Sequence, residues 1–222
     1  MVVAMQLDRS DELDTRMRLV HVATRLFAER GIDGVSVRDI TKAADANSAA
    51  IGYHFGSKEN LVREVFKSIA APINRTRLDA LTAYERAVGP DAPLDVEAVA
   101  RCLIEPALRT AADETHVSHY LGRLLLFART LPWDWMSDVR AEFYDEVFRR
   151  FVAAFSRALP EEGYEAICWR YDFLIGSLLS ASSYFDGTSR ISRVTGGRCD
   201  PKDVDTLVEE LIAFAAGAMR GR

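Results

Sequence analysis

Apolar side chains recur every three or four residues along nearly the whole chain, and this spacing limits the fold more than any other feature. The series Leu19, Val22 and Leu26 shows it first. An α-helix has 3.6 residues per turn and therefore places residues at this spacing on one face. No segment of convincing length alternates apolar and polar residues as a half-buried strand does. The sequence therefore predicts an all-α fold, and it contains no internal repeat.

Composition excludes several classes of protein. Hydrophobic residues make up 49% of the 222 residues and charged residues 27%, a balance typical of globular rather than disordered proteins. No run approaches the roughly 18 apolar residues of a membrane helix, and the N-terminus lacks the pattern of a secretion signal. Three widely spaced cysteines predict neither a disulfide framework nor a zinc site. We expect a cytoplasmic protein with no membrane partner, metal ion or other cofactor.

Helix-capping and helix-breaking residues divide the N-terminal region into short helices. A first helix is predicted from near Thr15 to Gly31, a residue suited to the left-handed position after a helix. Ser36 is placed to cap a second helix, and Asn47 to cap a third that runs to about Phe55. This is the layout of a helix-turn-helix, whose second helix lies in the major groove of DNA.

The same signals predict helices along the rest of the chain. Ser57 caps a helix that Pro72 should interrupt or kink. The segment 117–127 is apolar on nearly all sides, which predicts a central helix. Residues 187–197 should form a loop, after which Pro201 opens the last helix. Further helices are predicted near residues 95–112, 144–155 and 167–178.

The start of the third predicted helix suits contact with bases. Asn47, Ser48, Ala49 and Ala50 are short, as a close approach to DNA requires. Asn47 and Ser48 can form hydrogen bonds with bases or phosphates, and the alanines can touch thymine methyl groups. Alternatively, Asn47 is only a helix cap and the alanines are only good helix formers. The spacing alone leaves both interpretations open.

Charge is distributed unevenly along the chain. The formal net charge is −5, which argues mildly against binding to nucleic acid. Residues 15–67, however, carry nine basic and six acidic side chains, a net charge of +3. This region is compatible with DNA contact without establishing it.

Several segments of this region resemble the TetR family of bacterial transcriptional regulators. They are Thr15-Arg16, LFAERG at 26–31, VSVRDI at 35–40 and IGYHFGSKENL at 51–61. Their order and spacing match the family over residues 15–67, and Tyr-His-Phe with Lys three residues later is a specific signature. The resemblance implies a flexible tail over 1–14, a DNA-binding domain over 15–67, and an effector-binding and dimerisation domain over 68–222.

The resemblance also implies roles for individual residues at the DNA. Arg38 would contact a phosphate or a base edge, and Lys58 would hold a phosphate. Tyr53 and His54 would approach the DNA backbone, although Tyr53 could instead pack internally and His54 could wedge two helices apart. The residues expected to face the groove are Asn47, Ser48, Ala49, Ala50 and Gly52, whereas Ile51 and Phe55 are assigned to the core.

Two residues depart from the usual pattern of the family. Asp45 stands where glycine is usual, and it can still adopt a left-handed backbone, though less readily. Gly52 stands where many members carry a larger residue that faces the groove. Close approach of the backbone to DNA and simple drift both explain Gly52.

The C-terminal region offers candidates for two further surfaces. A small hydrophobic or amphipathic effector would bind among Arg123, Tyr120, Phe127 and Trp169, although aromatic residues more often fill a core. Small and apolar residues on the last two long helices would pair with a second copy, or would only close the monomer's own core. These candidate dimer residues are Gly176, Ser180, Leu207, Leu211 and Phe214.

The function implied is that of a ligand-responsive regulator, most simply a repressor, which binds a palindromic operator as a dimer and leaves it when an effector binds. An activator and an adaptor without DNA binding are alternatives on the same scaffold. An all-α enzyme is a further alternative. However, the sequence contains no nucleophile elbow, glycine-rich phosphate loop or HExxH pair. We therefore expect no catalytic activity.

Overall fold

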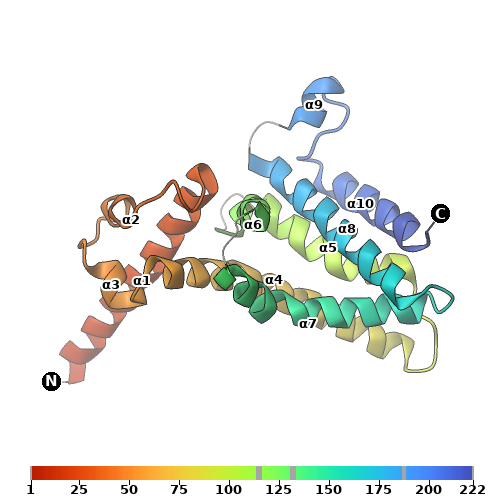
Figure 1. The fold of residues 1–222 in the computed structure, drawn as a ribbon, viewed down its shortest axis with the longest axis horizontal. Helices are drawn as coiled ribbons and strands as arrows, with labels where there is room; N and C mark the ends of the chain where they lie inside the picture. Colours follow the sequence, from red (N-terminus) through yellow and green to blue (C-terminus); the bar gives the residue numbers. More distant parts are fainter. Residues whose placement is uncertain (1, 114–116, 131–133, 187–188, 222) are drawn as a thin grey trace. The chain divides into compact units, whose positions relative to one another are not determined.

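The computed structural model describes residues 2–113, 117–130, 134–186 and 189–221, and within them every regular element is a helix (Figure 1). The all-α prediction is confirmed. The chain divides into two compact units, an N-terminal unit (residues 1–69) and a C-terminal unit (residues 70–222). The boundary falls inside one helix, α4 (Lys58–Val88).

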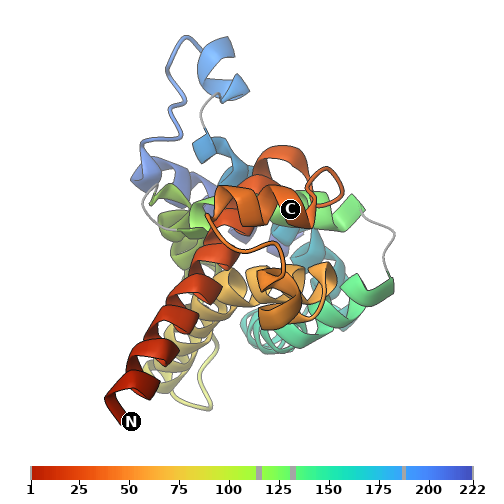
Figure 2. The ribbon, with the colours of Figure 1, turned by 90° about the vertical axis from the view of Figure 1, so that its left-hand side faces the viewer.

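The N-terminal unit is built from α1 (Val2–Arg30), α2 (Val37–Ala43), α3 (Ala50–Phe55) and the first turns of α4. Figures 1 and 2 both show the short helices α2 and α3 beside the much longer α1. The apolar face predicted for α1 is buried, since Leu19 and Phe27 are fully inaccessible to solvent. They share a core with side chains from the other three helices, namely Ile40, Ile51, Phe55, Leu61, Val65 and Phe66.

A second set of contacts joins three of these helices, α1, α3 and α4. The guanidinium of Arg16 pairs with the carboxylate of Glu64 and lies 5.2 Å from the centre of the Phe55 ring. Residues on α1, α3 and α4 are therefore joined by one partly buried cation. The packing holds the short α3 in place, because an isolated helix of six residues is not stable in water.

The C-terminal unit holds the other helices. In Figure 1, α5, α8 and α10 run close together, and residues of these three helices contact one another. The bounds of the elements are α5 (Val96–Ala112), η1 (Val117–Tyr120), α6 (Leu121–Thr130), α7 (Asp134–Ala158), α8 (Tyr164–Ser182), η2 (Ser183–Asp186), α9 (Arg190–Val194) and α10 (Val204–Met219).

Two helices of the N-terminal unit, α1 and α3, differ from the predicted bounds at their N-terminal ends. Helix α1 begins at Val2 rather than near Thr15, because residues 1–30 contain no glycine or proline to stop the helix. Helix α3 begins at Ala50, so Asn47 does not cap it directly. Instead, the Asn47 side-chain oxygen accepts a hydrogen bond from the Ala49 N–H at 2.8 Å, within the turn that precedes the helix.

Other differences concern prolines and packing. Helix α4 continues through Pro72, so of the two expected effects, interruption or a kink, the interruption is wrong. The predicted loop 187–197 contains the short helix α9, and Ser189 caps the N-terminus of this helix. Pro201 lies in a turn, and α10 starts only after its cap at Asp203. The segment 117–127 is divided between η1 and α6, and of its described side chains Leu124 is buried whereas Leu126 is 38% exposed.

Candidate DNA-binding interface

The turn between α2 and α3 depends on one residue with a left-handed backbone. Asp45 has φ = +47°, as expected for the position that glycine usually fills. The N–H of Asp45 donates to Lys42 O and that of Ala46 donates to Thr41 O at 2.9 Å, a Schellman-type helix end. This turn satisfies the last carbonyl groups of α2 and sets the direction in which α3 leaves.

Helix α3 has one face in the core and one face in solvent. Ile51 and Phe55 are 1% and 7% exposed, which confirms that they belong to the core. Tyr53 is 74% exposed, and its ring meets the His54 ring edge-on with centres 5.0 Å apart. Packing in the core therefore does not account for Tyr53, and the exposed side of α3 is left for contact with a partner.

An open hollow of about 510 Å³ adjoins the exposed side of α3. It brings together five residues predicted to contact DNA and adds residues from α1 and the turn. Its lining consists of Thr15, Arg18, Asp45, Ala46, Asn47, Ala49, Ala50, Tyr53 and His54. Ser48 and Gly52 are also exposed but lie outside this lining.

Arg18 is a member of this hollow that the sequence analysis missed. Its Nε donates to the carbonyl of Ala44 at 2.9 Å, and its Nη1 lies 3.1 Å from a carboxylate oxygen of Asp14. The first contact satisfies a carbonyl at the end of α2 and holds a positive charge beside the turn. Periodicity could not reveal Arg18, because the residue belongs to the polar face of α1.

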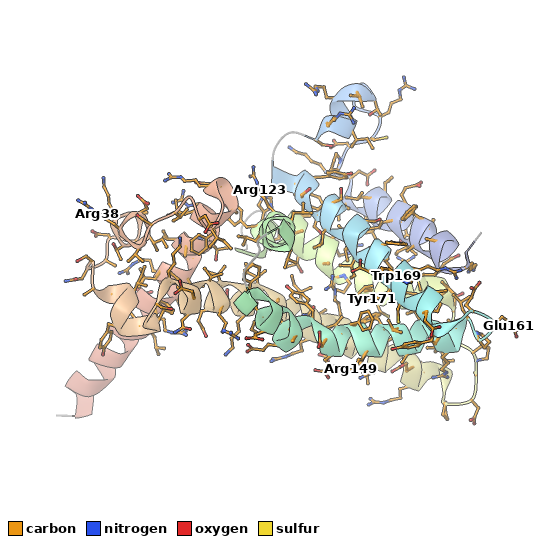
Figure 3. The ribbon with its side chains drawn as sticks, viewed as in Figure 1. Arg38, Arg123, Arg149, Glu161, Trp169 and Tyr171 are labelled. Atoms are coloured by element: carbon orange, nitrogen blue, oxygen red, sulfur yellow. The ribbon has the colours of Figure 1, made fainter. Side chains whose placement is uncertain are left out.

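Arg38 occupies the second position of α2 and projects outward from that helix (Figure 3). It is exposed, and its guanidinium forms no hydrogen bond or ion pair with the described residues. The predicted cap is confirmed: Ser36 and Asp39 form a reciprocal capping box at the start of α2. Hydrogen bonds from Ser36 hold the pKa of the Asp39 carboxyl below its usual value. The cap fixes the helical turn that carries Arg38.

Lys58 already has a partner inside the N-terminal unit. Its Nζ donates to the carbonyl of Ile32 at 2.7 Å and lies 5.9 Å from the centre of the Phe27 ring. Two of the three N–H groups of the ammonium remain for other acceptors. Lys58 therefore joins the start of α4 to the segment after α1, a structural role that the sequence analysis did not include.

The space around Gly52 shows that the fold does not require glycine there. A Cβ atom added to this residue would meet nothing within 4 Å. Its backbone is helical, so no positive φ demands glycine either.

The candidate effector residues do not form one site in the described structure. Tyr120 and Arg123 are partly exposed on η1 and α6, and the side chain of Phe127 lies outside the described residues. Trp169 is 65% exposed on α8 and stacks on Phe173, with ring centres 6.2 Å apart. Trp169 does not fill the core, because α8 turns Ile167 rather than Trp169 toward it.

The candidate dimer residues divide between the surface and the core. Phe214 is 57% exposed and Ser180 is exposed, whereas Leu211 is only 9% exposed and packs within the unit. Leu207 and Gly176 are partly exposed. The outer face of α8 also carries Phe173, which is 64% exposed and was missed although it follows Trp169 by one helical turn.

The described residues form neither a membrane-spanning helix nor a metal site. No described helix has both the length and the apolar character that crossing a membrane requires. Within the same part of the chain, no three or more His, Cys, Asp or Glu side chains are grouped so that they could hold a metal ion.

Comparisons with known proteins cover both units. Residues 19–65 match the family of bacterial regulatory proteins called tetR, and residues 101–218 match the tetracyclin repressor-like C-terminal domain. The transcriptional repressor KstR2 of Rhodococcus jostii is 30% identical over 138 residues, which are 61% of this chain and 63% of KstR2. The chain thus matches less than two thirds of the length of this curated relative.

Solved structures resemble this one over most of its length. The fatty acid degradation regulator FadR from Bacillus halodurans has a TM-score of 0.64 at 16% identity, covering 94% of this chain and 97% of FadR. AibR, solved with isovaleryl coenzyme A and operator DNA, has a TM-score of 0.66 at 16% identity, covering 90% of this chain and 97% of AibR. At this identity the likeness concerns the fold.

The C-terminal match spans more than half of the chain, and the N-terminal match covers the helices that surround the exposed α3. The chain therefore belongs to the TetR family of helix-turn-helix, DNA-binding transcriptional regulators.

Proposed function

We propose that this protein is a cytoplasmic, ligand-responsive repressor that binds a palindromic operator as a homodimer. Residues 15–67 form its DNA-binding domain, and residues 68–222 bind the effector and a second copy. The observation that carries the proposal is the exposed side of α3, where Tyr53 is 74% exposed while its neighbours Ile51 and Phe55 fill the core. The name of the relative KstR2 supports repression in particular.

In the proposed complex, the start of α3 lies in the major groove. Asn47, Ser48, Ala49, Ala50 and Gly52 face base edges, because short side chains let the backbone come close. Tyr53 and His54, on the same helix, approach the sugar-phosphate backbone. Arg38 reaches a phosphate or a base edge from α2, and Lys58 offers its two remaining N–H groups to a phosphate.

Fluorescence anisotropy with duplexes from the DNA upstream of the gene tests this interface. We expect sequence-specific binding that weakens steeply with added salt. Arg38→Ala should raise Kd by about 5- to 150-fold. Arg149→Ala, which removes an exposed arginine on α7, is the matched control and should leave Kd within about twofold of the wild type. Equal affinity for unrelated duplexes, or an unchanged Kd in Arg38→Ala, would contradict the proposal.

The second copy is proposed to pack on the outer faces of α8 and α10. On α8, Trp169, Phe173, Gly176 and Ser180 follow the spacing of one helix face, opposite the buried Ile167, Tyr171, Leu174 and Leu178. Phe214 adds an exposed aromatic ring on α10, which contacts α8. Exposed aromatic side chains grouped in this way are typical of protein interfaces.

Light scattering tests the dimer. We expect a dimer for the wild type and a monomer for Phe173→Glu, with an unchanged circular dichroism spectrum because Phe173 lies outside the core. Ile191→Glu changes an exposed residue of α9 and should remain dimeric. A monomeric wild type would remove this part of the proposal.

The effector is proposed to be a small hydrophobic or amphipathic molecule that favours a shape of the dimer unable to bind the operator. The AibR structure contains an acyl coenzyme A, which supports this class of ligand. An effector can shift the equilibrium only by its difference in affinity for the two shapes, typically about 1–3 kcal/mol. Release of operator DNA in the anisotropy assay is the corresponding test.

A further inference from the structure

The C-terminal unit contains a buried arginine, Arg77 on α4, which the sequence analysis did not single out. The residue is only 6% exposed. Its Nε donates to the carbonyl of Leu103 at 2.8 Å, and its Nη1 donates to the side-chain oxygen of Asn74 at 3.1 Å. Asn74 in turn donates to the carbonyl of Phe143 at 2.6 Å. The guanidinium is thus held in one orientation by residues of three helices.

No carboxylate of the described residues neutralises this charge. The groups close enough to influence the pKa of Arg77 are the phenols of Tyr144 and Tyr171. Burial raises the pKa of Tyr171 to about 12 and raises that of Tyr144 as well, so both phenols stay neutral. An arginine keeps its proton in a protein interior. A buried charge without a counter-ion is costly, and such charges are normally paired.

Unused hydrogen-bond donors accompany the unpaired charge. Arg77 has five N–H groups, of which two have acceptors among the described residues. The hydroxyl of Tyr144 is buried and has no partner there either. Buried polar groups usually have partners, and an anion bound beside Arg77 would give the hydroxyl of Tyr144 and the guanidinium a common acceptor.

The surroundings of these groups are apolar. Phe148 meets the ring of Tyr171 edge-on, with ring centres 5.2 Å apart, and Val147, Phe151 and Leu174 are buried on the same two helices, α7 and α8. A single negative charge would balance Arg77, whereas a doubly charged phosphate would leave one buried charge uncompensated. Carboxylates match the planar fork of arginine and accept two parallel hydrogen bonds.

We propose that Arg77 and Tyr144 bind the carboxylate of an organic acid with an apolar tail, and that this acid is the effector. The inference rests on the proposed function of the C-terminal unit. It moves the polar anchor from Arg123 to Arg77, on the helix whose first turns belong to the N-terminal unit. An acid bound there would contact an element that both units share.

Titration calorimetry with acetate, octanoate, decanoate and benzoate tests the site. 1-Octanol is the neutral control, and inorganic phosphate is the doubly charged control. We expect saturable binding of at least one of the longer or aromatic acids, no binding of 1-octanol or phosphate, and loss of acid binding in Arg77→Met. The inference is overturned if no acid binds, if 1-octanol or phosphate binds equally well, or if Arg77→Met binds acid like the wild type.

Tyr144→Phe provides a variant that keeps the fold. It removes only the hydroxyl that has no partner, so Tm should be equal or higher while the Kd of the acid rises about tenfold or more. Tyr84→Phe makes the same atomic change where the hydroxyl accepts the Asp95 N–H at 2.8 Å. It should lower Tm and leave acid binding unchanged. An unchanged acid affinity in Tyr144→Phe would remove this tyrosine from the site.

The DNA assay without acid separates the two proposals. If operator binding is intact and no acid binds, the carboxylate site is wrong and the proposed function stands. If no specific DNA binding is found, the proposed function fails whatever the acids do.

Discussion

The two units of this protein differ in where they put charged and aromatic side chains. In the N-terminal unit, the exposed side carries Arg38 and Tyr53, and apolar side chains from four helices form the core. In the C-terminal unit, a guanidinium at residue 77 is buried, while the indole of Trp169 and the ring of Phe173 lie in solvent. The second distribution costs free energy in an isolated monomer.

The difference indicates what each unit needs in order to be complete. The N-terminal unit also exposes large side chains, namely Leu13 and Met17 on α1 and Tyr53 on α3, but its exposed cation Arg38 lies in water and needs no counter-ion. In the C-terminal unit, the buried guanidinium of Arg77 has no carboxylate partner among the described residues, and the rings of Trp169, Phe173 and Phe214 are exposed. We infer that the first unit is a preformed binding surface and that the stability of the second depends on its ligands.

The largest loss of stability should follow from removing a buried aromatic ring from one of the two cores. Phe27→Ala and Phe151→Ala each remove a fully buried ring and should each cost about 3–5 kcal/mol. Since the rings lie in different cores, hydrogen exchange should rise chiefly in the unit that carries the change. Equal exchange in both units for either variant would show that they unfold together and would break the comparison.

A medium effect is expected from the lysine that supports the DNA-binding surface. Lys58→Met leaves the carbonyl of Ile32 without its charged partner and should destabilise the N-terminal unit by about 1.5–3 kcal/mol. Arg38→Ala should change stability by less than about 0.5 kcal/mol, since its guanidinium has no such contact. Urea unfolding compares the two. Equal stability of both variants would mean that the Lys58 contact contributes nothing.

A smaller effect should follow from the loss of the cap on α2. Ser36→Ala removes the hydroxyl that accepts the Asp39 N–H at 3.1 Å, and a lost cap of this kind costs about 1 kcal/mol. DNA affinity should also fall, because the turn that carries Arg38 frays. Ser189→Ala removes the corresponding cap of α9 and is the control, with normal DNA binding expected. Anisotropy and thermal unfolding measure both variants.

The smallest effect, and one of opposite sign, is expected at Gly52. Because a Cβ atom there meets nothing, Gly52→Ala should stabilise α3 by about 0.8–1 kcal/mol. If the backbone approaches DNA closely, the same variant binds its operator more weakly although it is more stable. Unchanged affinity for the operator would mean that Gly52 reflects sequence drift rather than a close approach to DNA. Thermal unfolding and anisotropy on the same sample decide between them.

Features that depend on a few neighbouring residues could be predicted from the sequence. The capping box of Ser36, the left-handed Asp45 and the end of α1 at Gly31 are such cases, since each is decided within one helical turn. The core positions of Ile51 and Phe55 followed from the family motif. The continuation of α4 through Pro72 could not be foreseen, because a long helix packed on its neighbours tolerates one missing hydrogen bond.

Features that depend on which helix packs against which were predicted poorly. Trp169 was predicted to contact the effector, yet it is 65% exposed, whereas Tyr171 on the apolar face of the same helix is 5% exposed. The contacts of α8 with α5, α7 and α10 bury the face that carries Tyr171. For the same reason, Arg123 was placed among the candidate effector residues and the buried Arg77 was overlooked. The residues of the candidate interface were predicted largely from the motif. The role of Arg18 and the contact of Lys58 with the carbonyl of Ile32 became evident only in the structure.

The left-handed aspartate has a consequence for how such a protein finds its operator. Asp45 adds an acidic residue to the lining of the hollow beside α3. A negative charge near a duplex repels phosphates of every sequence alike, so it shortens each stay on irrelevant chromosomal DNA. The same repulsion acts at the operator, where it weakens binding no more than it does at other sequences. We therefore expect Asp45 to lower the total affinity for DNA, to shorten the search for the operator and to reduce the number of molecules bound at other sequences.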